Sequence, residues 1–132
     1  MRYDKPVVVE EQMTPGEYEL FYAMAHLWST GLKEMRQRDI LHFVNGLRKE
    51  KGMKRLSWEN FHYHLSKLVK KPFVEKNGSL LSLKPGLYKI VRPAPMCLLI
   101  SDSQVVGVMC VYAPECDNVP FSKECKLFGN VK

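Results

Sequence analysis

The chain has 132 residues and a formal net charge of +6, and 45% of its residues are apolar while 26% are charged. This balance is typical of a globular protein and excludes a disordered tail, and the length allows one ordinary domain or a small domain with a stapled appendage. The longest apolar run, Val105 to Ala113, is too short to span a membrane, and acidic residues near the N-terminus argue against a signal peptide, so we expect a cytoplasmic protein.

Two helices are predicted in the first fifty residues. Thr14, Pro15 and Glu17 form a capping box with proline at the first helical position. Apolar residues then recur at helical spacing until Gly31, which ends the first helix. The second helix is predicted over Gln37–Glu50, with an apolar stripe and a basic last turn.

A third helix is predicted from the Ser57 cap to Lys70. Its exposed aromatic residues could stack on unpaired bases, but packing is the simpler explanation of Trp58 and Tyr63. The residues expected to face the core are Trp58, Phe61, Leu65, Leu68 and Val69.

Short strands follow the third helix, because Pro72 breaks the helical pattern and turn residues punctuate what remains. The strands are predicted over Phe73–Lys76, Leu80–Lys84 and Leu87–Val91, and Val7–Val9 can add a strand or dock on a partner. Three helices followed by a hairpin is the winged-helix order. We therefore expect an α+β fold in which a single winged helix-turn-helix domain precedes a small cysteine-rich metal-cluster domain. The predicted segments are residues 1–12 as an N-terminal extension, 13–92 as the winged helix and 93–132 as the cluster domain.

Positive charge is concentrated in the middle third of the chain. Residues 46–92 hold twelve Lys and Arg against three acids, whereas residues 1–45 and 93–132 carry net charges of −2 and −1. Such a segment is expected of a surface that meets phosphates, although Lys and Arg also keep small domains soluble. In helix-turn-helix proteins the helix after the turn enters the major groove. The candidate nucleic-acid contacts are Lys51, Lys54, Arg55, Lys67, Lys70, Lys71, Lys76 and Lys84.

Base-specific readout is less well supported than phosphate contact, because the third helix contains no Arg. We therefore expect DNA to be bound largely without sequence specificity. The chain shows no Gly-rich phosphate loop, paired carboxylates or nucleophile motif, so we expect neither an enzyme nor a small-molecule substrate.

The four cysteines indicate one metal site near the C-terminus. Cys97, Cys110, Cys116 and Cys125 lie within the last 36 residues, with 12, 5 and 8 residues between them. In a reducing compartment such a cluster favours metal-binding thiolates over disulfides, although cysteine is also a common buried apolar residue. No Cys-x2-Cys knuckle is present, which weakens a zinc assignment and leaves zinc and an iron–sulfur cluster as alternatives.

The segment from Cys110 to Phe128, CVYAPECDNVPFSKECKLF, resembles the C-terminal cysteine motif of the RNA polymerase III subunit that carries winged helices and a cubane cluster. The archaeal relative of that subunit is the beta subunit of transcription factor E, which is similar in plan over roughly residues 14–128. The resemblance implies a [4Fe-4S] cluster on Cys110, Cys116 and Cys125, with Cys97 as the fourth ligand. In the eukaryotic members the first two cysteines are close together, whereas twelve residues separate them here.

The resemblance also implies a function. It describes a general transcription initiation factor subunit that pairs with the alpha subunit of transcription factor E, binds the RNA polymerase clamp and assists opening of promoter DNA. The cluster would then be structural and would brace a partner-binding surface that includes Phe121, Leu127 and Phe128. The alternatives are an iron–sulfur-dependent winged-helix transcriptional repressor, for which no long dimerisation helix is evident, and a zinc-stabilised interaction module.

Overall fold

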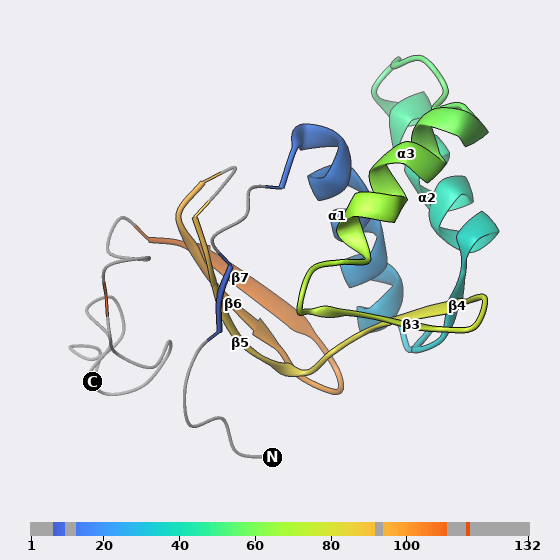
Figure 1. Cartoon of the computed structure of the whole chain (residues 1–132). Coiled ribbons are helices and arrows are strands. Elements are labelled where there is room, and N and C mark those ends of the chain that lie inside the picture. The colour runs from blue at the N-terminus through green and yellow to red at the C-terminus, as the bar shows by residue number, and fades with distance from the viewer. Residues whose placement is uncertain (1–6, 10–12, 92–93, 111–115, 117–132) are drawn as a thin grey trace.

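The computed structural model describes residues 7–9, 13–91, 94–110 and 116. Within these residues three helices and two small β-sheets form an α+β fold, with the helices gathered on one side and the larger sheet on the other (Figure 1). None of the helices in the described ranges combines the length and apolar character needed to cross a membrane.

All three helices occur where the sequence predicts them. Helix α1 (Pro15–Ser29) begins after Thr14, whose Oγ1 accepts a hydrogen bond from the backbone N–H of Glu17 at 3.2 Å. Helix α2 (Gln37–Glu50) has the predicted bounds. Helix α3 (Trp58–Leu68) is capped by the Ser57 hydroxyl and ends two residues earlier than predicted.

The smaller sheet has three antiparallel strands in the order β2-β4-β3. Strands β3 (Val74–Asn77) and β4 (Leu80–Leu83) form the predicted hairpin, in which Gly78 adopts a positive φ of 66° at the turn. The third strand, β2 (Met35–Arg36), lies between α1 and α2 and was not predicted. Two residues are too few to show a strand periodicity.

The larger sheet has the strand order β1-β5-β6-β7. Strand β5 (Gly86–Ile90) was predicted to follow the hairpin, but it pairs with β6 (Met96–Ile100) in a different sheet. Strand β7 (Val105–Met109) pairs antiparallel with β6, and β1 (Val7–Val9) pairs parallel with β5. This sheet joins strands from all three segments that were predicted from the sequence, residues 1–12, 13–92 and 93–132. The division of the chain into these segments stays a prediction.

One hydrophobic core extends across both halves of the molecule, and α1 lies at its centre. Phe21 of α1 packs edge-on against Phe73 with ring centroids 5.0 Å apart, and Phe73 packs against Tyr88 of β5 at 5.6 Å. At the other end of α1, the indole Nε1 of Trp28 donates a hydrogen bond of 2.7 Å to the carbonyl oxygen of Ser101, in the β6–β7 turn. The larger sheet is therefore fixed to the helices by packing and by a directional contact.

A buried charge pair lies at the N-terminus of α1. Glu17 is 2% exposed and Lys71 is 6% exposed, and the Lys71 Nζ lies 3.9 Å from a Glu17 carboxylate oxygen. The Thr14 hydroxyl donates a hydrogen bond of 2.9 Å to the other Glu17 oxygen. The helix N-terminus stabilises the same carboxylate, so Glu17 is held by three favourable interactions.

Lys71→Met is expected to lower the free energy of unfolding by roughly 3 kcal/mol, because it leaves the Glu17 carboxylate buried without its cation. Urea denaturation followed by circular dichroism measures this loss. The neighbouring change Lys70→Met is the control, since Lys70 is exposed and its replacement is expected to shift stability by less than about 0.5 kcal/mol. Equal effects of the two changes would contradict a structural role for the Glu17–Lys71 pair.

Candidate nucleic-acid interface and cysteine pair

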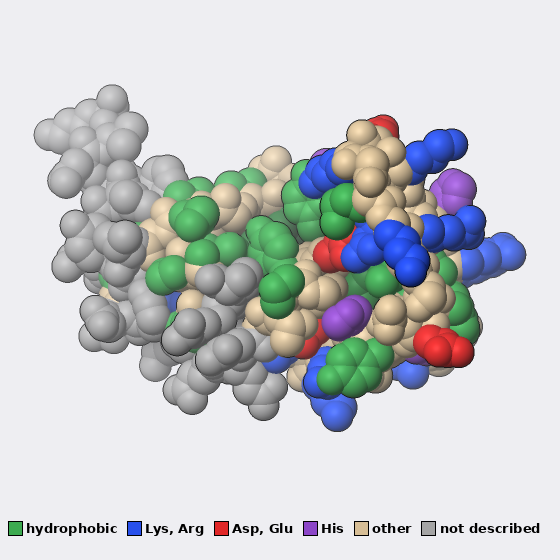
Figure 2. Space-filling view, turned by 90° about the horizontal axis from the view of Figure 1, so that it is seen from above, with side chains coloured by type: hydrophobic (Ala, Val, Ile, Leu, Met, Phe, Trp, Pro, Cys, Tyr) green, Lys and Arg blue, Asp and Glu red, His purple; other side chains and the backbone are tan. Residues whose placement is uncertain are grey.

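Most of the basic residues predicted to contact nucleic acid lie on the surface. Figure 2 shows Lys and Arg side chains gathered at the end of the molecule that carries the helices, away from the larger sheet. The exposed members of the predicted set come from the turn before α3, from α3 and the residues after it, and from the β3–β4 hairpin and its end. They are Lys51, Lys54, Arg55, Lys67, Lys70, Lys76 and Lys84.

The prediction for Lys71 is corrected by its position. Its side chain points into the protein beside Glu17 and is nearly inaccessible to solvent. The physical reason is that α3 ends at Leu68, so Lys71 lies in the turn that leads to β3 and no longer follows the outward face of the helix. A phosphate cannot reach this ammonium group without displacing the core around it.

An aromatic residue and a cation are paired on the outer face of α3. Tyr63 is 57% exposed, and Lys67 donates a hydrogen bond of 2.7 Å to its hydroxyl while the Lys67 Nζ lies 4.3 Å from the ring centroid. The hydrogen bond that Lys67 donates to Tyr63 is the main cause that raises the pKa of Lys67 above its usual value. Lys67 therefore presents a positive charge at neutral pH and below, one helical turn from Tyr63.

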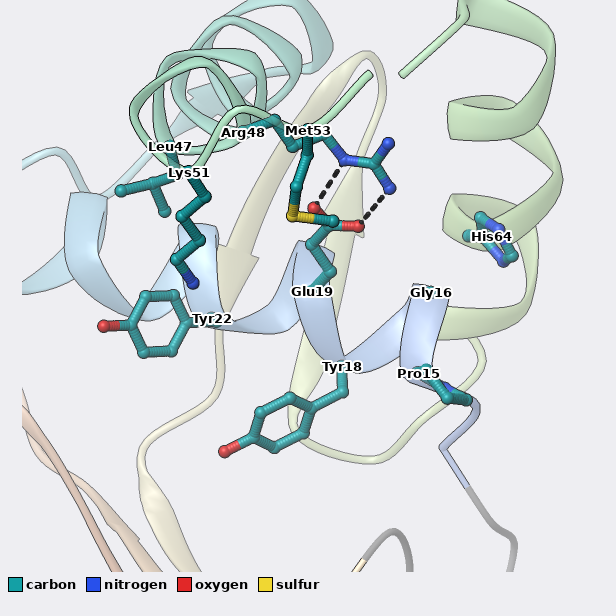
Figure 3. Close-up of a pocket in the computed structure, with 10 residues that line it drawn as sticks. All are labelled: Pro15, Gly16, Tyr18, Glu19, Tyr22, Leu47, Arg48, Lys51, Met53 and His64. Atoms are coloured by element: carbon teal, nitrogen blue, oxygen red, sulfur yellow. Dashed lines mark hydrogen bonds and ion pairs between the residues drawn. The ribbon is translucent and has the colours of Figure 1, made fainter. Parts of the chain in front are cut away.

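Arg48 contributes no free charge to this surface, because it is held by Glu19. Its Nε and Nη2 donate hydrogen bonds of 2.7 and 2.8 Å to the two carboxylate oxygens, across a hollow of about 660 Å³ between α1 and α2 (Figure 3). Its Nη1 donates to the carbonyl oxygen of Lys54. The bond to Glu19 raises the pKa of Arg48, although partial burial opposes this. The pair fixes α2 and the turn before α3 to α1.

The same hollow shows how closely α3 approaches the start of α1. The ring of His64 lies directly against Gly16, and a Cβ atom at Gly16 would overlap the imidazole (Figure 3). Glycine at this position therefore permits the close crossing of the two helices. Because α1 is fixed by the core, this contact sets the position of α3 and of its outward face.

Trp58 does not face the core as predicted. It is 49% exposed, whereas Phe61, one turn later, is completely buried. Trp58 is the first residue of α3, and helical side chains lean toward the N-terminus, so its indole extends beyond the part of the helix that covers the core. Helical periodicity correctly predicted that Phe61, Leu65 and Leu68 are buried. It could not show that the core does not extend to the first residue of the helix.

Two of the four predicted metal ligands lie side by side. Cys97 is in β6 opposite Val108 of β7, and Cys110 follows β7 two residues after Val108. Both cysteines therefore lie on the same face of the larger sheet, where they contact each other and are each 7% exposed. The backbone N–H of Cys110 donates to the carbonyl oxygen of Pro95 at 2.9 Å, which extends the hairpin to this position. The twelve intervening residues are thus a β-hairpin.

A cation lies on the face of the sheet that carries the two thiols. Lys89 of β5 pairs directly with Cys97 in the register of the sheet and is 3% exposed. Directly opposed residues in an antiparallel pair project from the same face. This places a lysine side chain in the neighbourhood of the sulfur atoms, which the sequence analysis missed because Lys89 entered it only in the charge count of residues 46–92.

The remaining predicted ligands are not brought together in the described part of the chain. Cys116 is partly buried, and no group of three His, Cys, Asp or Glu residues suited to a metal ion occurs among residues 7–9, 13–91, 94–110 and 116. Cys125 and the predicted partner contacts Phe121, Leu127 and Phe128 lie outside the described residues. The structure therefore supplies a pair of adjacent thiols and leaves the four-cysteine site a prediction.

Comparison of the chain with protein-family models, with curated proteins and with solved structures gives no significant match.

Proposed function

We propose that this protein is a nucleic-acid-binding transcription initiation factor subunit in which a winged helix is joined to a cysteine-based metal site. The observation that carries the proposal is the exposed basic surface on α3, on the turn before it and on the β3–β4 hairpin. In a winged helix these elements are the recognition helix and the wing. The order α1-β2-α2-α3-β3-β4 and the sheet order β2-β4-β3 support this assignment.

The character of α3 supports contact with phosphates more than reading of bases. Its exposed face presents Tyr63 and Lys67, with Lys70 just beyond the helix, and it carries no Arg. Lysine is a compact charge suited to phosphate oxygens, whereas bidentate readout of guanine usually employs arginine. We therefore infer binding to DNA largely without sequence specificity, as an initiation factor near melting promoter DNA requires.

We propose further that Cys97, Cys110, Cys116 and Cys125 hold a [4Fe-4S] cluster, with zinc as the alternative. The adjacent thiols of Cys97 and Cys110 fit two ligands of either site, because the hairpin presents both sulfur atoms from one face. The cluster would supply a cross-link rather than chemistry, tying the C-terminal segment to the larger sheet. The ammonium group of Lys89 offsets the negative charge that four thiolates bring to such a site.

The proposed partners are the alpha subunit of transcription factor E and the RNA polymerase clamp, which the cysteine motif suggests. An apolar groove of about 360 Å³ between α1 and strands β6 and β7 is a candidate surface for a protein partner. Tyr22 and Met109 line it and are 46% and 69% exposed. Exposed large apolar side chains beside a groove are typical of protein-binding surfaces.

Charge removal on α3 tests the nucleic-acid surface. The double change Lys67→Gln and Lys70→Gln is expected to weaken binding to duplex DNA and to reduce the slope of log affinity against log salt by about 2, since two phosphate contacts are lost. Fluorescence anisotropy over a series of salt concentrations measures both quantities. Lys33→Gln is the control, because Lys33 contacts Trp28 at the far end of α1. An unchanged salt slope in the double variant would show that the phosphate contacts are not made by Lys67 and Lys70.

Purification under anaerobic conditions tests the metal site. We expect a coloured protein that contains iron and sulfide, and we expect Cys110→Val to lose the metal although valine preserves the apolar packing. Absorbance together with iron, sulfide and zinc assays measures the result. A colourless protein that contains zinc would overturn the cluster, and a metal-free protein would overturn the metal site altogether.

Affinity purification of the full chain from its own cells tests the transcription role. Subunits of RNA polymerase and a second initiation factor subunit are expected to co-purify at stoichiometric levels. The change Met109→Glu, which places a charge beside the groove, is expected to reduce this recovery about tenfold or more while the protein stays folded. A stable homodimer that binds a single operator and recovers no polymerase would favour the repressor instead.

A further inference from the structure

We infer that the groove beside Trp58 binds an unpaired nucleobase, so that this protein holds single-stranded nucleic acid at a site separate from the duplex-binding face of α3. The inference deepens the proposed function and rests on it, because both require a nucleic-acid ligand. It assigns a substrate class, unpaired bases of a melted strand, to a groove in which Trp58 was expected from the sequence to pack in the core. It is carried by an exposed indole that lies beside three cations.

The indole of Trp58 is exposed and yet held in place. Its ring packs nearly parallel to Phe61, with ring centroids 5.5 Å apart and an interplanar angle of 27°, and the ring of His62 meets it edge-on at 4.4 Å. Nearly half of the side chain remains open to solvent. A supported aromatic ring with a solvent-exposed part loses little conformational entropy when a base stacks on it.

The groove that Trp58 lines has the size and charge that a nucleotide requires. It has a volume of about 640 Å³ and lies between α2 and the start of α3, with Leu41 among its apolar residues. Ligand sites for small molecules commonly have volumes of roughly 300–1,000 Å³. Its cations come from both ends of α2 and from the turn before α3, and all three are exposed. They are Arg38, Lys49 and Arg55.

The acid and the amide in the groove serve the protein's own backbone. Asp39 accepts a hydrogen bond of 3.1 Å from the backbone N–H of Arg36 and so caps α2. Asn45 accepts from the backbone N–H of Leu56 at 2.7 Å and donates to its carbonyl oxygen at 3.3 Å. The two bonds of Asn45 fix the turn before α3 to α2. The walls of the groove are therefore set before a ligand arrives.

An exposed indole beside three cations favours an unpaired base over the other ligands that a basic surface can bind. A base within a duplex is already stacked on both sides, and only a base released from the helix can lie against an indole. Arg38, Lys49 and Arg55 exceed the single acid of the groove by two charges, which suits the phosphates that flank such a base. An acidic peptide would satisfy the cations and would leave the indole without a stacking partner.

Anisotropy measurements with a labelled single-stranded oligothymidine and a labelled duplex of equal length test the inference on the full chain. We expect Trp58→Ala to weaken single-strand binding about tenfold or more, with little change in the salt slope and in duplex binding. Trp58→Phe is expected to retain most of the affinity. Lys49→Gln is expected to reduce the single-strand salt slope by about 1. Leu32→Ala is the control, because Leu32 is also an exposed large apolar residue but lies between α1 and β2, outside this groove.

Intrinsic fluorescence gives a second readout, because the chain has only two tryptophans and Trp28 is buried. Single-strand binding is expected to quench the emission of Trp58, and a polyglutamate peptide of similar charge is expected not to. If duplex binding persists while Trp58→Ala leaves single-strand affinity unchanged, or if polyglutamate competes equally, the inference fails and the proposed function stands. If neither nucleic acid binds, both fail.

Discussion

The packing of α1 against both sheets is the constraint on which the rest of the structure depends. The ring contacts from Phe21 through Phe73 to Tyr88 run from this helix to the larger sheet, and the Trp28 indole bonds the β6–β7 turn at the other end of α1. The basic elements and the sheet that carries the cysteine pair therefore share one core, while Cys97 and Cys110 form a small cluster of their own on that sheet. Separate domains joined by a linker would be free to reorient, whereas a shared core transmits any displacement of the sheet to α1.

The positions of α2 and α3 follow from α1 through a few specific contacts. The Arg48–Glu19 pair joins α2 to α1, and the contact of His64 with Gly16 brings α3 against the first turn of α1. Asn45 then fixes the turn between α2 and α3 by bonding both backbone groups of Leu56. The first two contacts join segments far apart in sequence, and together the three give the outer face of α3 a defined orientation relative to the larger sheet.

The sequence allowed the helices to be predicted because their signals are local. Thr14 and Ser57 cap their helices through bonds to residues three positions away, and such patterns can be read without knowing the fold. The pairing of β5 could not be read in this way. Its residues are buried on both faces, so they lack the alternation that marks a half-buried strand, and the choice between β4 and β6 as neighbour is decided by long-range packing.

Site residues were predictable to the extent that their roles depended on residue type alone. Cysteine spacing indicated a shared site, but only the register of β6 and β7 explains how twelve residues can separate adjacent thiols. Lys71 and Trp58 were misplaced for a common reason: Trp58 is the first residue of α3 and Lys71 lies beyond its last residue, Leu68, so helical periodicity does not describe the environment of either. An amphipathic pattern predicts the direction of a side chain and says nothing about what neighbouring elements cover.

The positions of the acidic residues explain why the positive charge near α3 is not cancelled by acids on the neighbouring helices. The acids of α1 and the first turn of α2 are directed to internal partners: Glu17 to Lys71, Glu19 to Arg48 and Asp39 to a backbone N–H. They therefore do not form an acidic face that could screen the exposed lysines. Between residues 46 and 91, eight exposed Lys and Arg face three exposed acids, so a phosphate approaching α3 meets a net positive field. Pairing of acids within the fold thus concentrates unpaired charge on the face where nucleic acid is proposed to bind.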